Sequence, residues 1–453
     1  MGKGALTLTK SRFWLGLLVS YTSYETYVYL RTQNVIYQRK DEYDKLMKSL
    51  SKPENRTHDV DYSKFKSATV GGMFVNPFEE YRPQTVFEFL IVRLMEIFEN
   101  VYGNFFEVHR KVPEAFGAEI EEVLKPQKPD LELLKNNSAI LRECINSGNI
   151  NRSGKAQGFS LLGFFRNSYV SEIRNQMNFT WLGQSCSFIQ VSGINFLTDP
   201  IIGGNLFLGS LGPQRLAKAP MTIDDIRYAA YNNLDFVLIS HDHPDHLEMD
   251  LVKKLGNKST WVVPIGLGKR LARQGIHNVI EMDWWDTVPL NRYIGNTGYD
   301  DHYEITCVPA MHWSGRFLFD GNKSLWGSYI VKRNGQSLFY HIGDTGYLKE
   351  LFHLIGAKNG PIYLSLLPIG QYCPSWHQTP RHISPSEAFQ ISKDVSSKFS
   401  MGIHWGTFKL SSEPILEPKF LLESLARNAK ESDKIIAPLL GKTYVYDLQD
   451  MDC

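Results

Sequence analysis

Four residues with metal-ligating side chains stand within six positions of one another near the middle of the chain. They are His241, His243, Asp245 and His246. Imidazole and carboxylate groups are common ligands of zinc and similar divalent ions, and a cluster this dense can supply one ion or be shared between two. A solvated, His-rich loop is the alternative interpretation. This spacing, directly after an apolar run, is improbable by chance, so the pattern indicates a metal site.

Further candidate ligands also stand just past the ends of apolar runs. The first cluster follows residues 236–239, whose composition is typical of a short strand buried on both faces. The others are His312 after residues 305–308, Asp344 after residues 338–342, and His404 after residues 400–403. Side chains delivered from the same ends of several strands converge in space, so we expect all seven residues to form one site.

The seven candidate ligands suit two zinc ions better than one, because a single tetrahedral zinc with an open position needs only three protein ligands. Asp344 stands in the turn 343–346, Gly-Asp-Thr-Gly, where glycine lets the backbone approach closely, and we expect its carboxylate to bridge the two ions. The expected division is His241, His243 and His312 on one ion, and Asp245, His246 and His404 on the other. Water held between two such ions loses a proton near neutral pH, which predicts a metal-activated hydroxide as the nucleophile.

The composition describes a globular protein with one large domain and an extension, or with two domains. The chain has 453 residues, of which 43% are hydrophobic and 21% are charged. Its net charge of +1 gives no overall attraction to nucleic acid, and no basic aromatic stripe accompanies the site. The five cysteines are scattered without a C-x-x-C pair, which argues against a disulfide framework and against a thiolate metal site.

The chain is divided into four parts on composition. Residues 1–40 are basic, rich in hydroxyl groups and contain a single acid, and the apolar block 13–19 lies among them. This favours a mitochondrial targeting segment with a membrane anchor over an interfacial segment or a disordered tail. The polar residues 41–70 are interpreted as a linker, residues 71–176 as a helical extension and insertion, and residues 177–448 as the catalytic domain.

A second apolar stretch, residues 86–108, has an apolar face wider than a surface helix needs. Charged residues, among them Glu88, Arg93, Glu96 and Glu99, interrupt it and oppose a bilayer crossing, so we expect it to pack deep in the fold or to lie in a membrane interface. Together with residues 1–40, it predicts a membrane-associated protein. The sequence leaves the oligomeric state open, a homodimer included.

The order of the ligands resembles the metallo-β-lactamase fold superfamily, where H-x-H-x-D-H is followed by a later His, a bridging Asp and a last His. Longer segments are similar to the N-acyl-phosphatidylethanolamine-hydrolysing phospholipase D family. These segments are residues 240–247, 283–285, 325–328, 343–347 and 403–408. The resemblance implies an α/β fold, an αββα sandwich with two Zn²⁺ at one edge. It also implies hydrolysis of a phospholipid, N-acylphosphatidylethanolamine, to an N-acylethanolamine and phosphatidic acid.

The same resemblance implies roles for residues outside the ligand set. Asp199, in Leu-Thr-Asp-Pro, is similar to a turn that supports the metal centre, and we expect it to position a ligand or to handle a proton. His382 matches a position that contacts the phospholipid. Gln184 stands where the family usually has His, so the rate or the substrate geometry should differ while metal binding survives. Apart from the resemblance, Tyr372 follows the Pro-Ile-Gly segment 368–370 and is expected to line the lipid entrance, with packing in an aromatic loop as the alternative.

Two polar residues near the ligands are predicted to be structural. His341 precedes the bridging turn on a strand and is expected to lie in the core. Asp242 lies between two ligands and is expected to form a hydrogen bond with the backbone of the loop rather than to bind metal.

Competing functions remain open at the level of sequence. Thioesterases and other phosphodiesterases use the same kind of site, and a membrane protein that binds lipid without turnover is the non-enzymatic alternative. A site that had lost its activity should also have lost some of its ligands, and all seven are present. The sequence therefore favours a phospholipase D with phospholipid and membrane as its partners, located at the mitochondrial inner membrane.

Overall fold

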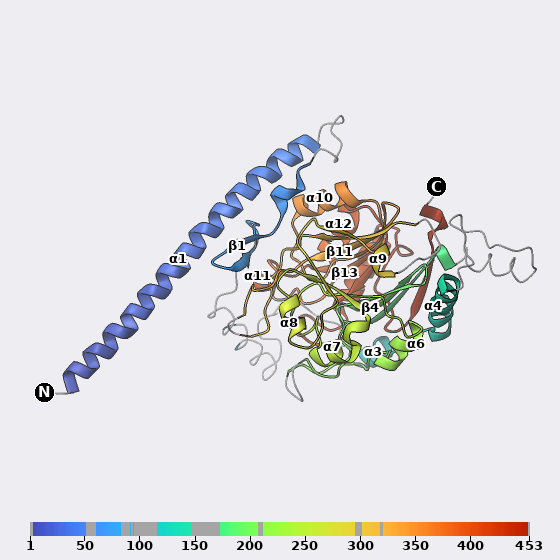
Figure 1. Cartoon of the computed structure of the whole chain (residues 1–453), viewed down its shortest axis with the longest axis horizontal. Coiled ribbons are helices and arrows are strands. Elements are labelled where there is room, and N and C mark those ends of the chain that lie inside the picture. Colours follow the sequence, from blue (N-terminus) through green and yellow to red (C-terminus); the bar gives the residue numbers. More distant parts are fainter. Residues whose placement is uncertain are drawn as a thin grey trace, which may run out of the picture.

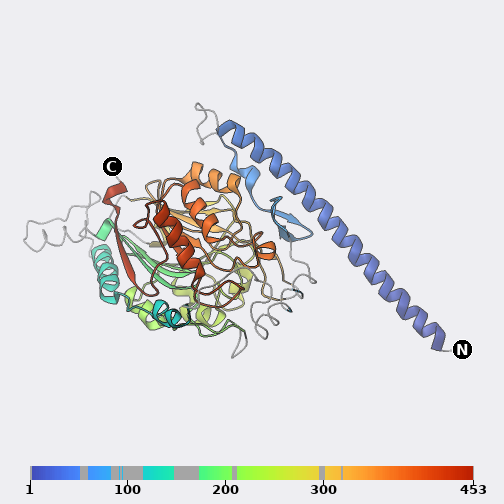
Figure 2. The same cartoon turned by 180° about the vertical axis from the view of Figure 1, so that it is seen from behind.

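Two seven-stranded sheets packed face to face form the body of the protein (Figure 1). The computed structural model describes residues 3–50, 60–82, 91, 94, 116–146, 173–206, 212–294, 301–317 and 320–451. Helices pack on the outer faces of both sheets, as the views from the front and from behind show (Figures 1 and 2). The predicted αββα sandwich is confirmed.

The first sheet has the strand order β16-β3-β4-β5-β6-β7-β8 and is antiparallel from β16 to β5 and parallel from β5 to β8. Its strands are β3 (Gln176–Gly183), β4 (Cys186–Val191), β5 (Ile194–Thr198), β6 (Phe236–Leu238), β7 (Thr260–Pro264), β8 (Val279–Met282) and β16 (Thr443–Asp447). In β6, Phe236 and Leu238 face the second sheet while Val237 faces the covering helices. Burial on both faces explains the unbroken apolar run in the sequence.

The second sheet has the strand order β15-β14-β13-β12-β11-β10-β9 and is antiparallel from β9 to β12 and parallel from β12 to β15. Its strands are β9 (Thr287–Pro289), β10 (Tyr303–Val308), β11 (Ser328–Arg333), β12 (Gln336–His341), β13 (Ile362–Pro368), β14 (Ser397–Ile403) and β15 (Ile435–Ile436). Phe196 of β5 meets Phe339 of β12 edge to face, with 5.3 Å between ring centroids. Such contacts join the two sheets into one core.

Helices on each side bury apolar side chains against the sheet beneath them. The helices of the body are α3 (Phe116–Val123), α4 (Leu131–Asn146), α6 (Ile223–Ala229), α7 (Met249–Leu255), α8 (Gly268–Ala272), α9 (Asn291–Ile294), α10 (Lys349–Asn359), α11 (Ser375–Gln378), α12 (Pro385–Asp394) and α13 (Glu417–Asn428). Leu134 of α4, Ile226 of α6 and Leu251 of α7 pack on the first sheet. The helices α10, α12 and α13 pack on the second.

The N-terminal part is one long helix, α1 (Lys3–Leu50), which lies along the body and projects beyond it (Figures 1 and 2). Arg39, Tyr43 and Leu46 near its C-terminal end are buried. The hairpin of β1 (Ala68–Val70) and β2 (Met73–Val75) lies beside it, with the Tyr24 hydroxyl against the glycine turn of the hairpin. In the described chain, no helix is both long and apolar enough to cross a membrane.

Residues 41–70, which were predicted to be a linker, contain regular secondary structure. The helix α1 continues through residue 50, the 3₁₀ helix η2 spans Tyr62–Phe65, and the strand β1 begins at Ala68. Polar composition misled the prediction, because one face of this charged segment packs against the body. The apolar stretch 86–108 lies outside the described residues except for Ile91 and Leu94.

Candidate metal centre

The seven residues predicted as ligands lie together at one edge of the sandwich. They belong to loops that follow β6, β10, β12 and β14, and none is more than 9% exposed. Because β6 and β12 come from different sheets, the edge between the sheets is where their carboxyl ends meet. The convergence expected from the sequence is present in the structure.

The first group consists of His241, His243 and His312. Nε2 of His241 lies 2.8 Å from Nδ1 of His243, which lies 3.2 Å from Nε2 of His312. Two nitrogens bound to one tetrahedral zinc are about 3.3 Å apart, so these spacings suit a shared cation. Burial lowers the pKa of His243 and of His312 to about 3. Both rings are therefore neutral at neutral pH, the form that binds metal.

The second group consists of Asp245, His246, Asp344 and His404. The Asp344 carboxylate lies 3.2 Å from Nε2 of His246 and 3.1 Å from Nε2 of His404. Burial opposes ionisation of Asp344, but the neighbouring imidazoles hold its pKa well below the ordinary value. Burial also lowers the pKa of His404, yet the carboxylates of Asp344 and Asp245 outweigh it and raise that pKa to about 9. Two buried carboxylates give this group the negative charge that favours a cation.

Asp344, a member of the second group, also faces the first group. Its Oδ2 atom is 3.9 Å from Nε2 of His241 and 3.8 Å from Nε2 of His312, in addition to its contacts with the second group. A Cβ atom on Gly343 would lie 2.5 Å from the Cβ of Ser240, so only glycine allows this approach of the turn. Imidazole and carboxylate donors without a thiolate fit a divalent ion such as zinc.

Two of the three predicted substrate residues are beside these groups. Nδ1 of His382 lies 3.6 Å from Oδ2 of Asp344 and has no hydrogen-bond partner among the described residues. The Gln184 amide donates to Oδ2 of Asp245 at 2.9 Å, and its nitrogen is 2.8 Å from Nε2 of His404. Both side chains therefore face the candidate metal positions.

Tyr372 differs from the prediction that it lines a lipid entrance. Its side chain is buried, and its hydroxyl donates to Glu417 at the start of α13. The hydrogen bond ties the loop after β13 to that helix, so Tyr372 has a structural contact here. Its position in an aromatic loop did not separate packing from substrate contact.

A hollow adjoins the second group. It is small, with a volume of about 20 Å³, and is bordered by Gln184 and His404 on the side of the metal groups. The rest of its lining mixes apolar and polar residues, among them Trp405, Phe408 and Lys409. A partly apolar hollow thus lies directly beside the second group.

The loop that carries four of the ligands is fixed by Arg316, which sequence reasoning missed. Its guanidinium donates to the carbonyls of Asp242, His243 and Leu247 at 3.0, 3.2 and 2.8 Å. The Asp242 carboxylate accepts from the Gly315 backbone N–H at 2.7 Å and lies 3.2 Å from the Arg270 guanidinium, so the described partners of Asp242 lie outside its own loop, where the prediction had placed them. In the sequence, the one feature that could have pointed to Arg316 is its position four residues after the candidate ligand His312.

Three residues of the centre have left-handed backbone conformations. The φ angles are 50° at Gln184, 35° at Asp199 and 62° at His404. Such conformations cost on the order of 1–3 kcal/mol each outside glycine, and they persist where surrounding contacts impose them. His404 N donates to the Gln184 carbonyl at 3.0 Å, so two of these residues hold each other in place.

Comparisons with known proteins were made at the levels of family and of whole sequence. A family model described as a beta-lactamase superfamily domain matches residues 194–405. The mitochondrial N-acyl-phosphatidylethanolamine-hydrolyzing phospholipase D of Saccharomyces cerevisiae is 36% identical over 449 residues, which cover 96% of this chain and 87% of that protein. N-acyl-phosphatidylethanolamine-hydrolyzing phospholipase D 1 of Caenorhabditis elegans is 37% identical over 256 residues, 54% of this chain and 68% of that protein. A UPF0173 metal-dependent hydrolase of Methanopyrus kandleri is 30% identical over 237 residues, 51% of this chain and 85% of that protein.

Proposed function

We propose that this chain, which belongs to the N-acyl-phosphatidylethanolamine-hydrolysing phospholipase D family of the beta-lactamase superfamily, is a di-zinc phospholipase D. Its substrate is N-acylphosphatidylethanolamine, and its products are an N-acylethanolamine and phosphatidic acid. The observation that carries the proposal is the convergence of seven buried His and Asp side chains into two adjoining groups, both of which Asp344 faces. A two-metal phosphodiesterase needs this arrangement.

The residues of the chain divide the work of the reaction between them. When bound, a zinc pair lowers the pKa of a water and neutralises charge on the phosphoryl oxygens. The reaction forms a bond from the water oxygen to phosphorus and breaks the bond from phosphorus to the ethanolamine oxygen, which takes up a proton. The carboxylates of Asp344 and Asp245 would hold the metal ions, and they would accept the proton that the water loses. The unpartnered Nδ1 of His382 faces the same space and can bind a phosphoryl oxygen.

The hollow beside the second group supports an amphiphilic substrate. Trp405 and Phe408 provide apolar surface, while Lys409 and Gln184 provide polar groups. Gln184 donates to Asp245 without carrying a charge itself, so it can orient that carboxylate. We assign Gln184 and His382 to the phosphodiester end of the substrate.

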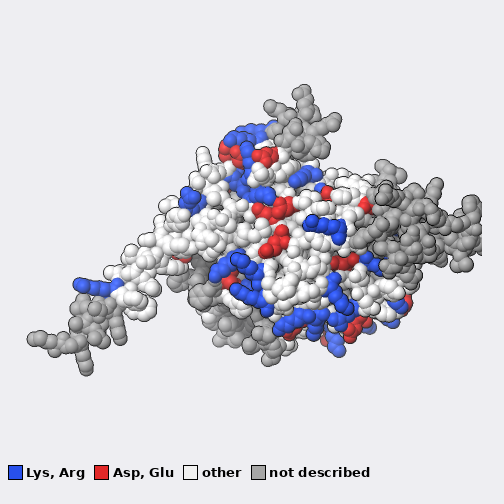
Figure 3. Space-filling view, in the orientation of Figure 1, with Lys and Arg blue, Asp and Glu red and all other residues white. Residues whose placement is uncertain are grey.

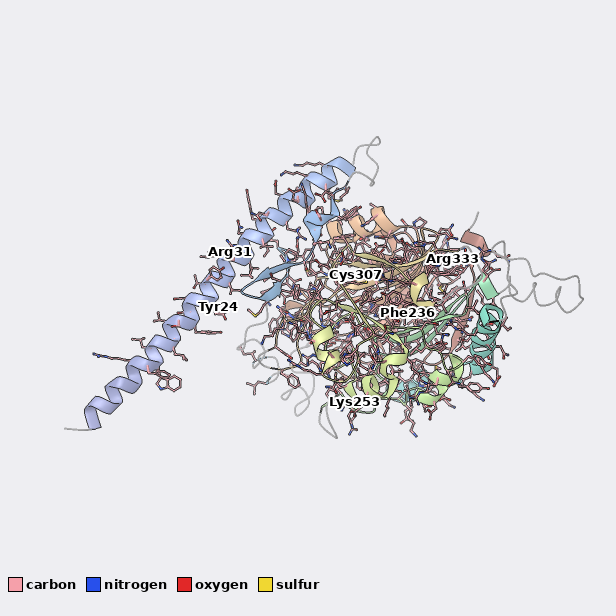
Figure 4. All side chains as sticks on the ribbon, viewed as in Figure 1. Tyr24, Arg31, Phe236, Lys253, Cys307 and Arg333 are labelled. Carbon is pink, nitrogen blue, oxygen red and sulfur yellow. The ribbon has the colours of Figure 1, made fainter. Side chains whose placement is uncertain are left out.

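We also propose that α1 brings the enzyme to a lipid surface. Phe13, Trp14 and Leu18 are 64%, 63% and 57% exposed on the part of the helix that projects from the body. Apart from its grey end, this part is mostly white in Figure 3, and the side chains drawn near the labelled Tyr24 in Figure 4 point outward around the helix. Aromatic and aliphatic residues of this kind favour the membrane interface. The name of the yeast relative supports a mitochondrial location, and we propose the inner membrane.

Lipid product analysis tests the proposed reaction. The full chain is incubated with vesicles that contain N-acylphosphatidylethanolamine, phosphatidylethanolamine or phosphatidylcholine, and products are measured by mass spectrometry with and without a chelator. We expect N-acylethanolamine and phosphatidic acid from the first lipid only, loss of both with chelator, and recovery with zinc. Metal analysis of the active protein should give two zinc equivalents per chain.

Two results would contradict the proposal in different ways. Equal cleavage of phosphatidylcholine removes the substrate assignment and leaves the chemistry. Fewer than two zinc equivalents in fully active protein removes the two-metal mechanism. A panel of thioesters in the same assay tests the thioesterase alternative, and turnover of a thioester in place of the N-acylated lipid would replace the phospholipase assignment.

A further inference from the structure

A buried carboxylate lies beneath the two metal groups and accepts four hydrogen bonds. Oδ1 of Asp199 accepts from the Ser240 backbone N–H at 2.7 Å. Its Oδ2 atom bonds the Ser240 hydroxyl at 2.7 Å, Nδ1 of His246 at 2.8 Å and Nε2 of His341 at 2.9 Å. None of these four residues is more than 1% exposed. Burial alone would raise the pKa of Asp199, but His341 and His246 hold it at about 2.

Asp199 reaches one candidate ligand of each metal group. It bonds Nδ1 of His246 directly, which leaves Nε2 of that ring toward Asp344 at 3.2 Å. The Ser240 hydroxyl also lies 2.9 Å from Nδ1 of His241, so Ser240 connects Asp199 to the first group. Hydrogen bonds of this kind fix the tautomer and the ring orientation of a metal-binding histidine.

His341 belongs to the opposite sheet. It is the last residue of β12 in the second sheet, whereas Asp199 follows β5 in the first. Their hydrogen bond therefore crosses the interface between the sheets directly beneath the metal groups. Three residues after His341 comes Asp344, which faces both groups.

A buried histidine at position 341 costs free energy that an apolar residue would not cost. The ring is fully buried, and its Nδ1 atom has no hydrogen-bond partner among the described residues. A buried polar group without a partner costs free energy, and an apolar side chain of similar size would avoid this cost. The described hydrogen bond of the ring is the one from Nε2 to Asp199.

We propose that His341 is a positioning residue of the metal centre. By donating Nε2–H to Asp199, it holds the carboxylate that sets the tautomer of His246 and, through Ser240, that of His241. It also fixes the Asp344 turn of the second sheet relative to the ligands of the first. The prediction that His341 lies in the core is thus met in its burial, and the proposal gives it a second role. The inference rests on the metal centre and not on which ester is cleaved.

Zinc affinity of matched His341 variants tests the inference. His341→Leu removes the donor, and His341→Gln places an amide donor near the position of Nε2. Zinc-free protein is titrated with zinc in competition with a chelator of known affinity, and its cobalt(II) form is examined by visible absorption. We expect His341→Leu to weaken at least one zinc site about 10- to 100-fold and to change the cobalt spectrum. His341→Gln should recover most of the affinity and the spectrum.

A control at the neighbouring residue and a second substitution of His341 complete the test. Tyr340→Phe changes a buried polar residue next to His341 on β12 and should retain wild-type zinc affinity. If His341→Leu does not fold, His341→Asn replaces it, because the shorter amide stays polar but falls short of Asp199. Wild-type zinc affinity and an unchanged cobalt spectrum in a donor-free variant would overturn the inference, even if the zinc-free protein melts earlier. A protein that binds two zinc ions normally and cleaves no N-acylated lipid would overturn the proposed function instead.

Discussion

At the level of single residues, the metal centre combines neutral and charged groups whose ionisation is set by burial and by each other. The buried rings of His243 and His312 are neutral, while Asp344 and Asp245 are held ionised by the imidazoles around them. Asp344 has the most connections, since its carboxylate faces both groups. It is therefore the residue whose charge matters most.

Replacing Asp344 by Asn should remove metal and activity together. The amide keeps the size of the side chain but loses the negative charge that faces both groups. We expect less than two zinc equivalents per chain and a fall in kcat/KM of about a hundredfold or more, measured by metal analysis and product assay. Asp250→Asn, on the exposed face of α7, is the control and should behave as wild type. Full activity of Asp344→Asn would exclude a bridging role.

Lys358 should make stability rise with pH in the alkaline range. Its ammonium group lies 3.7 Å from the Tyr62 ring centroid and 5.0 Å from that of Trp285. Burial, and next the charge of Lys332, lower the pKa of Lys358 to about 8 from the ordinary 10.5. Between these values the unfolded chain binds more protons than the folded one, so the free energy of unfolding increases as pH rises from 8 to 10.5.

Chemical denaturation of wild type and Lys358→Met at several pH values measures this effect. Subtracting the unfolding free energy of the variant from that of the wild type at each pH removes the contributions of all other titrating groups. The wild type should gain stability relative to Lys358→Met from pH 8 upward. Parallel curves over that range would contradict the depressed pKa.

At the level of elements, the ligands lie on loops, and residues that are not ligands hold these loops in place. Arg316 fixes the loop after β6, and the capping box of Ser384 and Glu387 fixes the start of α12 just after His382. In this box the Ser384 side chain accepts from the Glu387 backbone, and the Glu387 carboxylate accepts from the Ser384 backbone. The position of His382 depends on where α12 begins.

Removing the cap of α12 should destabilise the fold without emptying the metal centre. Ser384→Ala leaves the first-turn N–H of the helix without its acceptor, which costs about 1 kcal/mol of unfolding free energy. Ser384→Thr retains the hydroxyl and should restore most of that stability. We expect unchanged zinc content in both variants and, in the alanine variant, a rise in KM through His382. Urea titration and lipid kinetics measure these effects, and equal stability of the alanine and threonine variants would show that the cap contributes nothing.

At the level of the whole molecule, α1 projects from the body that carries the candidate metal centre, and its projecting part is the one that we propose to contact a membrane. Residues 3–23 lie beyond the contact of Tyr24 with the β1–β2 turn and extend over about 30 Å of helix. The body itself presents charges of both signs on the face in Figure 3, which accords with a net charge of +1. Lipid binding should therefore depend on α1 more than on overall charge.

Deleting residues 2–23 should uncouple membrane binding from catalysis. Flotation with vesicles of phosphatidylcholine and an anionic phospholipid should recover the full chain and lose the truncated one. Zinc content and hydrolysis of detergent-dispersed substrate should remain, because the deletion ends before the buried part of the helix. A full-length variant with serine in place of Phe13, Trp14 and Leu18 controls for length. Unchanged flotation of both variants would shift membrane binding to another surface, with residues 86–108 the next candidate.

The sequence determined the chemistry of this protein through local spacing. The types and spacing of the ligands in the segment His241–His246 predicted the first part of the site. The apolar runs that precede His312, Asp344 and His404 predicted that these residues join it, because side chains at the same ends of several strands converge. Only the tertiary structure decided the roles of residues far apart in sequence. Asp199 and His341, separated by 142 positions, meet because the two sheets pack face to face, and no local pattern encodes that contact. Packing likewise made residues 41–50 part of a helix where composition indicated a linker.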